Sequence, residues 1–183
     1  MSARTVSDRL AAIPNVLTML RFALIPFFIV LYVQSGDGSS WAAGWIFLVA
    51  GVTDQVDGWL ARRWHVESRF GRLADPLADR LMIDSAVILL WLEGKLPWPG
   101  ALAILLRDVI LVGGYRLLMP RGIDVPVSKL GKLATWIMYL AVGFLTVTGH
   151  DTHWPLWVFW TGLGLALLAA AQYMLAARRK VAA

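Results

Sequence analysis

Apolar residues dominate six stretches of the chain, each close to the length that an α-helix needs to cross a lipid bilayer. Crossing the hydrocarbon core takes roughly 20 apolar residues. Polar turn clusters at 35–40 and 149–153 separate some of the stretches, while Pro97, Pro99 and Pro120 bound another. The pattern predicts an all-α integral membrane protein with six transmembrane helices, over residues 16–34, 41–62, 76–93, 97–119, 130–148 and 154–177.

Basic residues gather at alternate breaks between these stretches. The two termini and the segments after the second and fourth stretches are rich in Lys and Arg, whereas the other three loops hold only Lys95. The positive-inside rule therefore predicts both termini in the cytoplasm of a multi-pass protein of the cell (inner) membrane. For residues 1–12 we expect either a short amphipathic helix on that surface, with Val6 and Leu10 facing lipid, or a disordered tail.

Composition agrees with a membrane protein. Of the 183 residues, 58% are hydrophobic, whereas a soluble domain has roughly 45–50% apolar residues. The mean hydropathy is +0.64. The net charge of +5 is explained by topology, so we expect no nucleic-acid partner. The absence of cysteine excludes disulfides and thiolate metal sites. We treat residues 1–183 as one membrane-embedded domain; a very apolar soluble bundle is the alternative.

Five aspartates interrupt the second and third apolar stretches. Charged side chains within a span are costly, and they usually mark functional sites. They lie on both sides of one short loop, where a helical hairpin would bring them together: Asp54, Asp57, Asp75, Asp79 and Asp84.

Helical spacing favours a shared site. Asp54 and Asp57, with Gly58 and Ala61, follow the i, i+3, i+4, i+7 pattern of one helix face. Asp75 and Asp79 are four residues apart, and Asp75 before Pro76 is a predicted helix N-cap. Arg62 follows Ala61 at a position from which it could reach a phosphate.

Several carboxylates in a low-dielectric setting repel one another unless cations offset their charge. Ligation by oxygen alone favours Mg²⁺, Mn²⁺ or Ca²⁺ over zinc or copper, and paired hard cations serve phosphoryl transfer. In the alternative interpretation, these aspartates only cap helices or pair with arginines such as Arg62, Arg72 and Arg80.

The segment Asp54-Gln-Val-Asp57-Gly58-Trp-Leu-Ala61-Arg62, eight further residues, and Gly71-Arg-Leu-Ala-Asp75-Pro-Leu-Ala-Asp79 resembles the full signature of the CDP-alcohol phosphotransferases. The resemblance implies an enzyme that transfers a phosphatidyl group from CDP-diacylglycerol to an alcohol at the cytoplasmic membrane face. It implies two Mg²⁺ or Mn²⁺ ions held by Asp54, Asp57, Asp75 and Asp79, with Asp79 also the general base. Gly58, Ala61, Arg62 and Gly71 would contact the CDP moiety.

The acceptor alcohol is the open question within this family. The opening from Ile13 to Arg21, which includes Asn15 and Thr18 as candidate nucleotide contacts, resembles the phosphatidylglycerophosphate and cardiolipin synthase branch. Arg107-Asp108 resembles the cardiolipin synthases, which accept phosphatidylglycerol, although a plain ion pair is the alternative. Glycerol 3-phosphate is the second candidate acceptor. Basic residues on the same side could bind the acceptor's phosphate, or could serve only topology and lipid contact: Arg107, Arg116, Arg121, Lys129 and Lys132.

A function of another class is a divalent-cation transporter that uses the aspartates as a cation pathway. The four motif aspartates lie at one face of the membrane, and Arg21, Arg80 and Arg107 would oppose cation passage, so the enzyme is favoured. A homodimer is expected from the family resemblance. His65, His150 and His153 lie in predicted loops without metal-ligand spacing and are expected at the surface.

Overall fold

Six α-helices make up the described part of the chain, which contains no strand. The computed structural model describes the backbone of residues 3–64, 69–118 and 128–182, and the side chains of residues 16–17, 19–53, 80–111, 113 and 128–175. The helices are α1 (Ala3–Gln34), α2 (Trp41–Trp64), α3 (Arg69–Leu92), α4 (Trp98–Leu118), α5 (Lys129–Val147) and α6 (Trp154–Ala182). For the residues that the structure describes, the predicted all-α fold and the six helices are confirmed.

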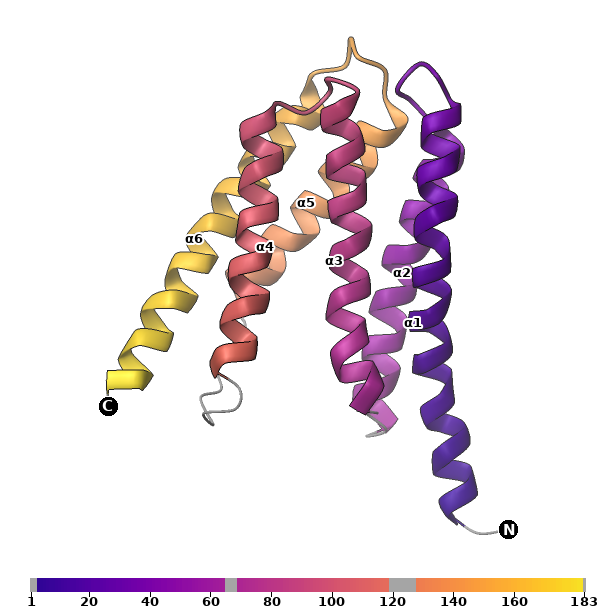
Figure 1. The fold of residues 1–183 in the computed structure, drawn as a ribbon, viewed down its shortest axis with the longest axis vertical. Helices are drawn as coiled ribbons and strands as arrows, with labels where there is room; N and C mark the ends of the chain where they lie inside the picture. Colours follow the sequence, from indigo (N-terminus) through magenta and orange to yellow (C-terminus); the bar gives the residue numbers. More distant parts are fainter. Residues whose placement is uncertain (1–2, 65–68, 119–127, 183) are drawn as a thin grey trace.

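Both chain ends lie at one end of the bundle. The opposite end is formed by three loops, residues 35–40, 93–97 and 148–153, as Figure 1 shows. α1 packs against α2 and α3, α5 packs closely against α6, and α3 contacts α2, α4 and α5. The helix α3 is therefore in contact with four of the other five helices.

Aromatic side chains join α1, α2 and α5 in the core. The ring of Phe47 lies 5.8 Å from that of Phe28 and 4.3 Å from that of Tyr139, measured between ring centroids. The Tyr139 hydroxyl donates a hydrogen bond of 2.8 Å to the backbone oxygen of Phe47. Gly51 leaves room for this ring, because a Cβ atom there would lie 2.4 Å from it.

Two helices begin earlier than predicted. Residues 3–12 are helical, which was one of the two alternatives, but they continue into α1 and do not form a separate helix. The predicted N-cap at Asp75 is wrong, because α3 begins at Arg69 and runs through Pro76. Pro76 costs the helix one backbone hydrogen bond, because its nitrogen carries no hydrogen. Extending the helix back to Arg69 lets the other backbone groups before Pro76 form helical hydrogen bonds.

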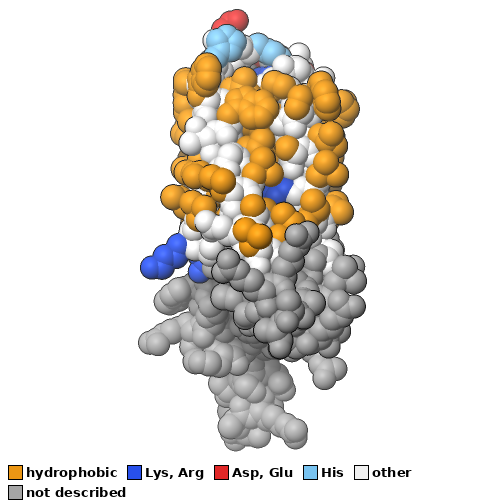
Figure 2. Space-filling view, turned by 90° about the vertical axis from the view of Figure 1, so that its left-hand side faces the viewer, with side chains coloured by type: hydrophobic (Ala, Val, Ile, Leu, Met, Phe, Trp, Pro, Cys, Tyr) orange, Lys and Arg blue, Asp and Glu red, His pale blue; other side chains and the backbone are white. Residues whose placement is uncertain are grey.

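Exposed hydrophobic side chains cover the described surface between the two ends of the bundle. Figure 2 shows this band below a polar tip that carries His and acidic residues, with Lys and Arg side chains at its lower edge. Among the described residues, α5 and residues 154–175 of α6 are long and apolar enough to cross a membrane, and Met19–Gln34 and Trp41–Thr53 are shorter apolar helices. Six crossings and their orientation stay predictions.

Lys95 ties the loop end of the bundle together. It is buried, and its ammonium donates hydrogen bonds to the backbone oxygens of Leu145 and Thr148, the former at 2.9 Å, at the C-terminal end of α5. Burial lowers the pKa of Lys95, an effect that the charges of Asp37 and Glu93 partly oppose. The Tyr32 hydroxyl donates to the Gly38 oxygen at 2.9 Å and so fixes the neighbouring loop. The only basic residue of the three loops at this end is therefore a helix cap.

Candidate active site

The hairpin of α2 and α3 carries the four motif aspartates on neighbouring helices. The two helices contact each other, and four residues, 65–68, join the end of α2 to the start of α3. Asp54 lies ten residues before Trp64, and Asp79 lies ten residues after Arg69, so both are about 15 Å from the joined ends. Asp57 and Asp75 form a second level, about 9–11 Å from those ends.

This backbone arrangement agrees with the predicted meeting of the two pairs of aspartates. The side chains of residues 54–79 lie outside the described residues, and so do those of Asn15, Thr18, Arg116 and Arg121. Among the side chains that the structure does describe, no group of three His, Asp or Glu residues could hold a metal ion. The predicted metal site and nucleotide contacts stay predictions that rest on the motif and on the hairpin.

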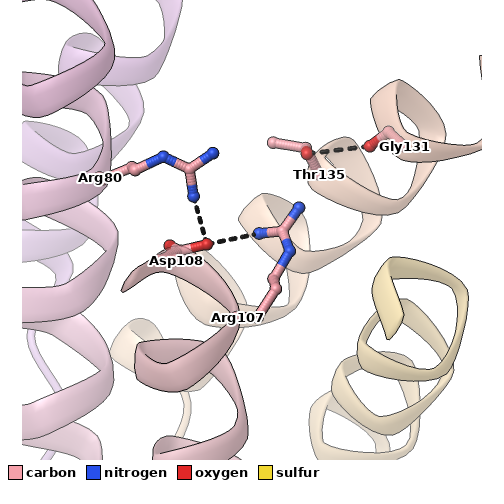
Figure 3. Close-up of polar contacts among 5 residues, drawn as sticks. All are labelled: Arg80, Arg107, Asp108, Gly131 and Thr135. Carbon is pink, nitrogen blue, oxygen red and sulfur yellow. Dashed lines mark hydrogen bonds and ion pairs between the residues drawn. The ribbon is translucent and has the colours of Figure 1, made fainter. Parts of the chain in front are cut away.

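A charged cluster lies in the middle of the bundle, between α3 and α4. Figure 3 shows the guanidinium groups of Arg80 and Arg107 directed at one carboxylate oxygen, Oδ1 of Asp108. The Arg107 Nη1 lies 2.9 Å from this oxygen, and the Arg80 Nη1 is also bonded to it. The Asp108 side chain is only 5% exposed, against 10% for Arg107 and 25% for Arg80.

The sequence flagged Arg107 and Asp108 as neighbours, with an ion pair as one alternative, and that ion pair is present. The second bond, to Arg80, was missed, because Arg80 and Asp108 are 28 residues apart and no spacing rule links them. The sequence does place both charged residues inside apolar stretches, and this marks each of them as a candidate functional residue without showing that they pair.

Asp84 and Arg21 are further charged residues inside the bundle. Oδ1 of Asp84 is buried and has no hydrogen-bond partner among the described residues. Arg21 is almost fully buried in α1. The sequence analysis named both residues as charged positions inside apolar stretches, and it predicted no role for either in the enzyme.

Lys129 and Lys132 lie at the start of α5, where both are exposed. Ser128 caps this helix, since its side chain accepts a hydrogen bond of 3.1 Å from the backbone N–H of Gly131. α4 ends at Leu118 and the C-terminal helix α6 at Ala182, so the start of α5 lies at the end of the bundle where both termini lie (Figure 1). His150 and His153, at the other end, are exposed as predicted.

Comparison with known protein families decides the assignment. A sequence model described as CDP-alcohol phosphatidyltransferase matches residues 11–172, which is most of the chain. The chain belongs to the CDP-alcohol phosphatidyltransferase family. The predicted family and the predicted enzyme class, a transferase of phospholipid synthesis, are thereby confirmed.

The relatives that this chain matches include proteins of two differently named activities. A "Cardiolipin synthase (CMP-forming)" of Streptomyces coelicolor is 39% identical over 149 residues, covering 79% of this chain and 69% of the relative. A "CDP-diacylglycerol--glycerol-3-phosphate 3-phosphatidyltransferase" of Escherichia coli is 34% identical over 178 residues, covering 91% of this chain and 94% of the relative. Both branches named in the sequence analysis are therefore represented among the relatives of this phosphatidyltransferase.

Proposed function

We propose that this phosphatidyltransferase joins the phosphatidyl group of CDP-diacylglycerol to a hydroxyl of phosphatidylglycerol, giving cardiolipin and CMP. The observation that carries the proposal is the α2–α3 hairpin, which holds Asp54 level with Asp79 and Asp57 level with Asp75 within the family motif. Four carboxylates at two matching levels of one hairpin suit a site for the pyrophosphate of the donor.

Asp54, Asp57, Asp75 and Asp79 would hold two divalent cations, Mg²⁺ or Mn²⁺. Carboxylate oxygens are the ligands that these hard cations prefer, so the residues on the hairpin fit the group. Such ions, when bound, neutralise the charge that develops on phosphoryl and leaving-group oxygens. Without cations the four carboxylates would repel one another at the edge of the apolar bundle.

In the proposed reaction, the acceptor's hydroxyl oxygen attacks the phosphorus atom that carries the diacylglycerol. The bond from that phosphorus to the bridging oxygen breaks, and CMP leaves with the bridging oxygen. The hydroxyl proton passes to the carboxylate of Asp79, which acts as general base. Gly58, Ala61, Arg62 and Gly71, with Asn15 and Thr18 on α1, would contact the CDP moiety.

The preference for phosphatidylglycerol follows the cardiolipin synthase of Streptomyces coelicolor, which is 39% identical to this chain. Arg107, with Arg116, Arg121, Lys129 and Lys132, would bind the acceptor's phosphate. A second candidate acceptor is glycerol 3-phosphate, because the Escherichia coli relative of that name matches over 94% of its own length.

We further propose six membrane crossings with both termini and the site at the cytoplasmic face. Most exposed tryptophans lie toward the loop end of the bundle, where an interfacial belt is expected, and Trp136 in the middle of α5 is the exception among the described residues. The tryptophans near the loop end are Trp41, Trp45, Trp91, Trp98, Trp154, Trp157 and Trp160. Apart from Lys95, the lysines and arginines lie in the middle of the bundle or toward the other end, which supports the orientation that the positive-inside rule predicts. A homodimer is a further prediction from the family.

The test is CMP release from CDP-diacylglycerol by purified protein in Mg²⁺ or Mn²⁺, with one acceptor supplied at a time. We expect release with phosphatidylglycerol, loss of release after chelation with EDTA, and recovery when the cation is added back. Release of CMP with glycerol 3-phosphate but not with phosphatidylglycerol would mean that glycerol 3-phosphate is the acceptor, and the proposed reaction class would stand. Folded, metal-loaded protein that releases no CMP, yet passes Mn²⁺ into liposomes free of CDP-lipid, would favour the transporter instead.

A further inference from the structure

Two arginines from different helices share one buried carboxylate oxygen in the middle of the bundle. Arg80 lies near the centre of α3 and Asp108 near the centre of α4. Oδ1 of Asp108 accepts hydrogen bonds from the Nη1 atoms of both Arg80 and Arg107. The Asp108 side chain is only 5% exposed. The carboxylate therefore holds both guanidinium groups at a fixed place between the helices (Figure 3).

Arg80 keeps most of its hydrogen-bonding capacity. A guanidinium has five N–H donors, and among the described residues Asp108 is its only hydrogen-bond or ion-pair partner. Its side chain is also the most exposed of the three, at 25%. Arg80 can therefore donate to a ligand without giving up the bond to Asp108.

The remaining donors of Arg80 fit an anionic group of matching shape. These donors, and not an excess of charge, favour an anion, because the carboxylates of Asp84 and Asp108 both interact with the two guanidinium groups. Asp84 lies one turn along α3 from Arg80, but it makes no hydrogen bond among the described residues and so does not occupy the arginine donors. A phosphate oxygen matches the planar fork of an arginine better than any other common anionic group except a carboxylate.

We infer that Arg80 binds the phosphate of the acceptor together with Arg107, and that Asp108 is the positioning residue for both arginines. The inference rests on the proposed function, in which the aspartate site takes the pyrophosphate of the donor and leaves the acceptor's phosphate to other residues. Arg80 directly follows Asp79 in α3, so one helix carries both the proposed base and this phosphate ligand. The ligand is a phosphate monoester or diester that lies next to the attacking hydroxyl.

The experiment measures the KM of acceptor and donor separately for Arg80→Met, Asp108→Ala and the double variant in the metal-loaded protein. We expect the acceptor KM to rise at least about tenfold in each single variant while the KM for CDP-diacylglycerol changes little. In the double variant, the loss should be smaller than the two single losses combined, because Asp108 acts through the arginines. Asp151→Asn, in an exposed loop at the other end, is the matched control.

Thermal unfolding separates this inference from the proposed function. Short-chain phosphatidylglycerol and glycerol 3-phosphate, each tested alone, should raise the unfolding temperature of the wild type, and the gain should disappear in Arg80→Met. If a different phosphate-bearing acceptor proves to be the substrate and Arg80→Met raises its KM, the proposed acceptor fails and the arginine site stands. The arginine site would be overturned if no compound that serves as acceptor raises the unfolding temperature of the wild type, or if the acceptor KM and the donor KM rise equally in Arg80→Met.

Discussion

At the scale of single residues, Asp79 has two proposed tasks, as a metal ligand and as the base that takes the acceptor's proton. Asp79→Asn keeps the size and one oxygen of the side chain but removes its basicity. General-base catalysis contributes typically about 10²–10⁴-fold, so we expect a loss of kcat in this range, with binding of CDP-diacylglycerol largely kept. Steady-state CMP release and a donor-binding assay measure the two effects. Full activity in this variant would remove Asp79 from the base role.

Asp37, in the first loop, gives a prediction about pH. The backbone N–H of Ser39 donates a hydrogen bond of 3.0 Å to its carboxylate, which lowers the pKa of Asp37 below the ordinary 3.8. A carboxylate with a lowered pKa in the folded state stabilises the fold above the unfolded pKa and loses that contribution as pH falls through the folded value.

We therefore expect Asp37→Asn, which keeps an oxygen acceptor for Ser39, to lower the unfolding temperature slightly at pH 7. The difference from the wild type should shrink as pH falls below 3.8. Unfolding scans of both proteins across this range test it, and a difference that stays constant with pH would contradict the assignment to charge.

Which residues the sequence could predict depended on how far apart in the chain the partners are. The four motif aspartates could be proposed as one site because their spacing is regular on two adjoining helices, and that site stays a prediction. The bond between Arg80 and Asp108 was not found, because it depends on how α3 and α4 turn toward each other, which apolar patterns do not specify. Lys95 was noted as a lone basic residue, but its capping of α5 depends on a fold that brings residues 95 and 145 together.

At the scale of helices, close packing of α5 against α6 depends on Gly162. A Cβ atom at this position would lie 2.8 Å from Cγ of Met138 and 3.1 Å from its backbone nitrogen. The backbone atom cannot move aside as a side chain can, so we expect Gly162→Ala to cost about 1–3 kcal/mol. For a chain of this size, that corresponds to a fall of at least about 2 °C in the unfolding temperature in detergent.

Gly164, on the same helix, provides the control. A Cβ atom there would have nothing within 4 Å, so Gly164→Ala adds a methyl group without a clash. Alanine is also the better helix former, and we expect an unfolding temperature equal to or above that of the wild type. Equal losses in both variants would mean that the α5–α6 contact does not limit stability.

Helix positions were predictable where turn residues separate apolar runs. The ends at Gln34, Trp41 and Trp154 coincide with the predicted bounds because polar clusters lie beside them. The starts of α1 and α3 were misplaced, because the charged residues that precede each apolar run are still helical. Apolar patterning reports which part of a helix faces lipid, and it does not report how far the helix continues beyond the membrane.

At the scale of the whole molecule, the proposed topology can be tested with single introduced cysteines, because the chain has no cysteine of its own to react with the label. Asp151 and Lys129 are exposed at opposite ends of the bundle. We expect a membrane-impermeant maleimide to label Asp151→Cys in intact cells and to label Lys129→Cys only after the membrane is opened. Labelling of both cysteines in intact cells, or the reverse pattern, would contradict an arrangement with both termini in the cytoplasm.

In the proposed six-span topology, the bond between Arg80 and Asp108 also bears on how the chain enters the membrane during synthesis. α3 and α4 are joined by residues 93–97 and leave the ribosome before α5 and α6 exist. Each of these two helices carries central charges that are costly in lipid, but as a hairpin they can neutralise one another. We therefore expect the translocation machinery to release α3 and α4 as a pair, with the later helices added to a hairpin whose central ion pair has already formed.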